Sequence, residues 1–181
     1  DETTDYYNVT DFYRMRYAQS RVMLLDFDRN TQELYDGKNT ELTSKGIDLG
    51  VVAKDVQYQS NKSSDIVAFV QEGELWSYNR SANKTTQIFS FRDGDLDERE
   101  NLQEHGVKIV RVEESGDIDF VVDGYMNREV HEGEVGIAVC HYGAELNQVE
   151  EELFIPMKSS YEYLKEDMEL LSYVTRDDML Y

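Results

Sequence analysis

The chain has 181 residues, 40% hydrophobic and 31% charged, which suffices for one domain with a packed core. Its 38 acidic and 18 basic side chains give a formal net charge of −20. This charge disfavours nucleic acid and direct membrane binding by this segment, because nucleic acid and anionic lipid both attract basic surfaces.

The first residue is Asp1 rather than Met, and no signal-peptide pattern follows it. We therefore expect a mature or trimmed piece of a longer protein. Cys140 is the single cysteine, so an intramolecular disulfide framework is excluded. The whole range 1–181 is predicted to be one domain, with 1–20 as an N-terminal segment.

Two repeating units are predicted between residues 21 and 91. In the first, 22–28 and 33–35 read as strands around a polar turn at 28–31. In the second, three strands follow one another at 66–70, 75–78 and 86–91. Glu72-Gly73 supplies a two-residue hairpin turn between the first two of them, because glycine allows a positive φ.

The connector 92–106 contains carboxylates at alternate positions, Asp93, Asp95 and Asp97. Oxygen ligands at this spacing predict a calcium site, although Glu98 stands where such loops need glycine. Because of that glutamate, the favoured interpretation is that Asp97 caps a short helix over 98–104, and the calcium site is the alternative. No cofactor other than Ca²⁺ is expected.

A third unit is predicted over 107–155, with strands at 107–112, 118–122, 135–142 and 149–155. A long excursion at 123–134 interrupts it, where the second unit has a two-residue turn. Loops on a rigid scaffold collect binding groups, which indicates a ligand site here. Its candidate residues are Tyr125, Asn127, Arg128, His131 and Glu132. The other interpretation is that Tyr125 and Met126 extend the preceding strand and the polar groups bond to the backbone of the turn.

The last stretch, 156–181, is predicted to begin a further unit. Ser160 is a suitable N-cap, and apolar residues recur at spacings of three and four up to Leu171, which predicts a helix over 160–173. Residues 171–175 read as the first strand of another hairpin. The long connectors 92–106, 123–134 and 156–170 are expected at one end of the sheets.

Four-stranded units of about 40 to 50 residues are typical of β-propeller blades. The run GELWSYNRSANKTTQIFSF resembles the blade hairpin of bacterial propeller repeats. The string GYMNREVHEGEVGIAV resembles uncharacterised envelope-associated proteins of clostridial-type bacteria. The expected fold is therefore all-β, with antiparallel meander sheets, about three propeller-like blades and one or two short helices. A β-sandwich is the alternative.

Enzyme chemistry is not expected. Cys140 and His141 are neighbours on a predicted strand, so their side chains point to opposite faces and cannot form a dyad. The long excursion at 123–134 and the lack of an enzyme motif predict non-catalytic binding or sensing of a polar ligand or a protein. The chain would act on the extracellular side of a bacterial envelope, anchored through a segment outside it. A propeller glycoside hydrolase fragment and a structural spacer are the alternatives. Open sheet edges predict a homodimer.

Overall fold

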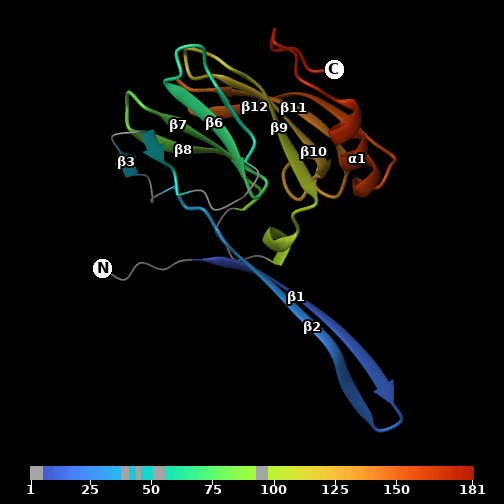
Figure 1. Ribbon diagram of the computed structural model, residues 1–181. Helices are drawn as coiled ribbons and strands as arrows, with labels where there is room; N and C mark the ends of the chain where they lie inside the picture. The colour runs from blue at the N-terminus through green and yellow to red at the C-terminus, as the bar shows by residue number, and fades with distance from the viewer. Residues whose placement is uncertain (1–5, 38–40, 44–45, 51–55, 93–97) are drawn as a thin grey trace. The chain divides into compact units, whose positions relative to one another are not determined.

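The computed structural model describes residues 6–37, 41–43, 46–50, 56–92 and 98–181 (Figure 1). Every sheet in these ranges is antiparallel, and the helical elements described are one short α-helix and one 3₁₀ turn. The predicted all-β fold of antiparallel meander sheets is thereby confirmed. The chain divides into two compact units, Asp1–Val52 and Ala53–Tyr181, which are taken in turn.

The first unit contains a long hairpin of β1 (Tyr7–Ala18) and β2 (Arg21–Glu33), and a short one of β3 (Glu41–Thr43) and β4 (Gly46–Asp48). The predicted turn at 28–31 is wrong, because these residues lie inside β2 and pair with β1. The polar run stays in the strand because β1 pairs with it, and within it Arg29 forms an ion pair with Asp11 across the ladder, at 2.6 Å. The segment 1–20 was not predicted to form a strand.

The second unit begins with a four-stranded meander of β5 (Tyr58–Ser60), β6 (Ile66–Gln71), β7 (Glu74–Asn79) and β8 (Lys84–Phe89). The predicted turn is confirmed, with φ of 51° at Glu72 and 77° at Gly73. The strand β5 was not predicted, because its three residues show no apolar alternation. It covers the edge of β6, which therefore lies inside the sheet.

The second meander consists of β9 (His105–Val112), β10 (Ile118–Tyr125), β11 (Val135–Gly143) and β12 (Gln148–Pro156), in sequence order across the sheet. The four strands predicted over 107–155 are confirmed. Buried and half-buried side chains alternate along β9 and β11, as expected when one face of a sheet packs against a core.

The two meanders pack together through one hydrophobic core, and Figure 1 shows β6 to β8 on one side of the β9–β12 sheet. Alternate side chains of β9, β10 and β11 face this core. Its members share near-complete burial: Ile66, Ala68, Leu75, Phe91, Val107, Ile109, Val112, Ile118, Phe120, Val122, Met126, Ala138, Cys140 and Tyr142. Burial of apolar surface on this scale is the main source of the unit's stability.

The helix α1 (Tyr161–Leu171) contacts β9 and β10, and Figure 1 shows it across the sheet from β6–β8. The predicted helix and its N-cap position, Ser160, are confirmed. The strand predicted at 171–175 begins later than expected, because Leu171 ends the helix. The predicted hairpin is present as a short antiparallel pairing, with a bridge between Val174 and Leu180 and reciprocal backbone hydrogen bonds of 3.0 Å between Tyr173 and Tyr181. The Lys108 ammonium donates to the carbonyls of Met168 and Ser172 at the C-terminal end of α1, where a cation is favourable.

The predicted helix over 98–104 is shorter in the structure, a 3₁₀ turn η1 (Glu98–Asn101).

In the part of the chain that the structure describes, no helix has both the length and the apolar composition needed to cross a membrane.

Candidate functional site

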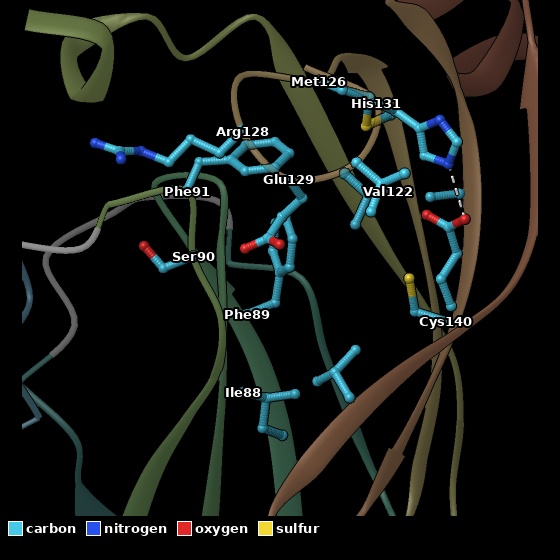
Figure 2. A pocket seen from close by; sticks show the side chains of 14 residues that line it. Ile88, Phe89, Ser90, Phe91, Val122, Met126, Arg128, Glu129, His131 and Cys140 are labelled. Atoms are coloured by element: carbon cyan, nitrogen blue, oxygen red, sulfur yellow. Dashed lines mark hydrogen bonds and ion pairs between the residues drawn. The ribbon is translucent and has the colours of Figure 1, made fainter.

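A pocket of about 400 Å³ opens between β8 and the β9–β12 sheet (Figure 2). Its lining comes from both meanders and from the excursion between β10 and β11: Ile88, Phe89, Ser90, Phe91, Val122, Met126, Arg128, Glu129, Val130, His131, Ala138, Cys140, Val149 and Glu151. This volume lies within the usual range of small-molecule sites.

The pocket walls are apolar. Phe89 and Phe91 form one wall, with their ring centroids 4.9 Å apart in an edge-to-face arrangement. Val122, Ala138 and Cys140 form the other, because they occupy core-facing positions on β10 and β11. Such walls suit the hydrocarbon or aromatic body of a ligand.

The rim is the excursion from Met126 to Glu134, which the backbone closes into a compact loop. The Met126 amide donates to the Glu134 carbonyl, at 2.8 Å, and the Gly133 amide donates to the Met126 carbonyl, at 2.9 Å. Within this loop Glu129 has a φ of 72°, a left-handed conformation that costs a non-glycine residue about 1 to 2 kcal/mol. Residues held in this way cluster at functional sites.

The Glu129 carboxylate points into the pocket (Figure 2). Among the described residues, no hydrogen-bond donor or cation pairs with it. A carboxylate that sits without a partner at the mouth of an apolar pocket favours a cationic ligand group.

The imidazole ring of His131 lines one side of the pocket, and two contacts hold it in place. It stacks on Phe154 with a centroid separation of 3.7 Å and an interplanar angle of 10°. Its Nε2 lies 3.0 Å from Oε1 of Glu151, the contact drawn in Figure 2. The carboxylate of Glu151 is therefore engaged by the protein, in contrast to that of Glu129.

Arg128 lines the pocket with its side chain, but its guanidinium points away from the apolar walls (Figure 2). It lies 3.7 Å from Glu100 of the preceding connector. Glu132 likewise reaches this connector, in an ion pair of 2.7 Å with Arg99. The predicted convergence of the connectors 92–106 and 123–134 is thus confirmed.

Asn127 links the two connectors through hydrogen bonds. Its side chain is buried, and its amide donates to the carbonyls of Arg99 and Leu102. Of the five predicted ligand residues, Arg128 and His131 line the pocket, whereas Tyr125, Asn127 and Glu132 do not.

Cys140 is a neutral part of the wall. Burial and then the nearby carboxylates of Glu151 and Glu152 raise the pKa of its thiol to about 12. A thiol with this pKa stays protonated at physiological pH, so it is a poor nucleophile.

The neighbour of Cys140 on β11 points to the opposite face of the sheet, as predicted. There His141 Nδ1 lies 2.7 Å from Asp119 Oδ1, and this hydrogen bond raises the pKa of the imidazole. Cys140 and His141 therefore form no dyad.

The predicted calcium ligands Asp93, Asp95 and Asp97 lie outside the described residues. Within the described ranges, His, Cys, Asp and Glu form no group of three or more suited to a metal ion.

Sequence reasoning missed most of the pocket lining, including Phe89, Phe91, Glu129 and Cys140. The excursion 123–134 was recognised by its length, but the packing of β8 against the second meander leaves no local pattern in the sequence. No family model, curated protein or solved structure matches this chain.

Proposed function

We propose that the chain is a non-catalytic binding module for small amphipathic organic cations. In this proposal the apolar body of the ligand enters between Phe89, Phe91 and Ala138, and its ammonium group meets Glu129 at the mouth. The observation that carries it is the unpartnered Glu129 carboxylate pointing into a pocket of about 400 Å³ with apolar walls.

The energetics favour this class of ligand. Each methylene group transferred from water into the apolar pocket contributes about 0.8 kcal/mol. The ammonium group at the mouth gains about 0.2 to 1 kcal/mol from an ion pair with Glu129. Ordering of the ligand and desolvation of its head group oppose both terms, so micromolar to millimolar affinity is expected.

The net charge supports the same class. A surface with 20 more acidic than basic side chains raises the local concentration of cations and lowers that of anions. This long-range effect weakens with salt, since the screening length is about 10 Å at 0.1 M. The resemblance to envelope-associated proteins implies only a location, and we propose that the module acts on the outer side of a bacterial envelope.

The proposal is tested by isothermal titration with n-octylamine, with octanoate as the anionic control. Octylamine is expected to bind at one site, and octanoate at least about tenfold more weakly. Ala138→Phe places a ring inside the pocket and is expected to weaken octylamine binding tenfold or more. Val139→Phe adds the same ring on the opposite face of β11 and should leave binding unchanged.

A second pair of titrations isolates the head group. Glu129→Gln removes the charge without changing the size, so it should weaken octylamine binding about fivefold, the worth of an ion pair of about 1 kcal/mol. It should leave the binding of neutral octanol unchanged. Equal binding of octylamine by wild type, Ala138→Phe and Glu129→Gln would contradict the proposal.

A further inference from the structure

The hairpin of β1 and β2 carries an apolar face. In the register of the two strands, Tyr17 pairs with Val22, Met15 with Leu24 and Tyr13 with Phe27, all on the same side. Tyr7 and Val9 continue this side along β1 because side chains alternate with a period of two. We call the eight residues the hairpin face: Tyr7, Val9, Tyr13, Met15, Tyr17, Val22, Leu24 and Phe27.

Every side chain of the hairpin face is large and exposed, with exposed fractions between 45% and 75%. The opposite side of the hairpin is mostly polar, although it includes Phe12 and Met23. Its polar residues are Asn8, Thr10, Arg14, Arg16, Arg21, Asp26, Asp28 and Asn30. An amphipathic ribbon of two strands is only marginally stable by itself. A contiguous apolar patch above a few hundred Å² marks an interaction site.

The charge of the hairpin indicates which partner fits. Residues 7–33 contain four basic side chains (Arg14, Arg16, Arg21 and Arg29) and four acidic ones (Asp11, Asp26, Asp28 and Glu33), so their sum is zero. The whole chain carries −20. Two copies of this chain repel each other over most of their surfaces, and the hairpin is a long region where this repulsion is absent.

An ion pair lies on the same side of the hairpin as this face. Arg29 lies on the same side as Phe27, and its guanidinium makes two hydrogen bonds to Asp11, at 2.6 and 2.7 Å. The pair is internally compensated, so a second copy can cover it without desolvating a lone charge. Glu33, opposite Tyr7 at the open end of the hairpin, is a further carboxylate on this side.

We infer that the hairpin face binds the same face of a second copy, in a symmetric dimer. Two such faces would stack like the sheets of a sandwich, about 10 Å apart. Eight side chains burying about 100 Å² each bury roughly 800 Å² per copy, the size of a standard specific interface. A twofold axis lets the same patch serve both partners. This inference is independent of the ligand pocket.

The test is the molar mass of the full chain by sedimentation velocity, from 1 to 200 μM protein. Wild type is expected to reach the dimer mass. Leu24→Glu places a carboxylate in each copy's half of the interface and should weaken the dimer at least a hundredfold. Asn30→Glu makes the same charge change on the same strand but on the opposite side, and should keep the dimer.

Circular dichroism of each variant shows whether it is folded. Tyr17→Ser, near the turn of the hairpin, is a second variant that should weaken the dimer. Added salt should strengthen the dimer, because it screens the repulsion between the acidic chains. A wild type that stays monomeric at every concentration and salt, or an equal loss in Leu24→Glu and Asn30→Glu, would overturn the inference. So would a monomer that sediments with vesicles containing phosphatidylserine through the same Leu24-dependent face.

Discussion

Replacing Glu74 by alanine is expected to lower the free energy of unfolding by about 3 to 5 kcal/mol. Glu74 is buried at the start of β7, where its carboxylate accepts hydrogen bonds from Arg92 at 2.9 Å and Ser90 at 2.7 Å. The indole of Trp76 donates a third, at 3.2 Å. Removal of the Glu74 carboxylate leaves the half-buried Arg92 guanidinium without a compensating charge. This uncompensated charge accounts for most of the loss in stability.

Urea denaturation followed by circular dichroism measures this loss. The double variant Glu74→Leu/Arg92→Met removes both charges and keeps apolar volume, so it should recover most of the stability. A loss of less than about 1 kcal/mol in Glu74→Ala, the value of an exposed pair, would mean that burial does not strengthen this network.

The second large effect is expected at Gly124, near the end of β10. Its φ is +124°, and a Cβ there would lie 2.5 Å from the Glu104 carbonyl oxygen and 2.7 Å from the Cα of His105. Both obstacles are backbone atoms and cannot rotate away. Gly124→Ala should therefore cost about 3 to 5 kcal/mol, the sum of backbone strain and of overpacking.

Gly133→Ala is the matched control for this variant. Gly133 also has a positive φ, +91°, but a Cβ there meets nothing within 4 Å. It should show the backbone strain alone, about 1 to 2 kcal/mol. Equal melting temperatures for Gly124→Ala and Gly133→Ala would mean that the close approach of β10 to the connector at Glu104 is not a constraint.

Strands with strong local patterns were predictable from the sequence. The apolar runs of β6, β9, β10 and β11 and the Glu72-Gly73 turn determine most of the two meanders, because alternation and turn chemistry act between near neighbours. The errors lie where partners are distant in sequence. The strand β2 continues through a polar run because β1 pairs with it, and β5 is a strand only because β6 offers it an edge.

The candidate site was predictable only in part for the same reason. The excursion 123–134 was recognised from its length, and Arg128 and His131 within it do line the pocket. Asn127, of equally suitable chemistry, is turned inward to bind the carbonyls of the preceding connector. The side on which such a residue faces depends on contacts with a segment 25 or more residues away, and residue type does not encode it.

The affinity of primary alkylamines of increasing length measures most directly whether the pocket takes an amphipathic cation. If the chain enters the space between Phe89, Phe91 and Ala138, each added methylene should tighten binding about fourfold, the equivalent of 0.8 kcal/mol. The gain should stop once the pocket of about 400 Å³ is full, and it should stop at shorter chains in Ala138→Phe. An affinity that is independent of chain length, or that rises identically in wild type and Ala138→Phe, would contradict the account.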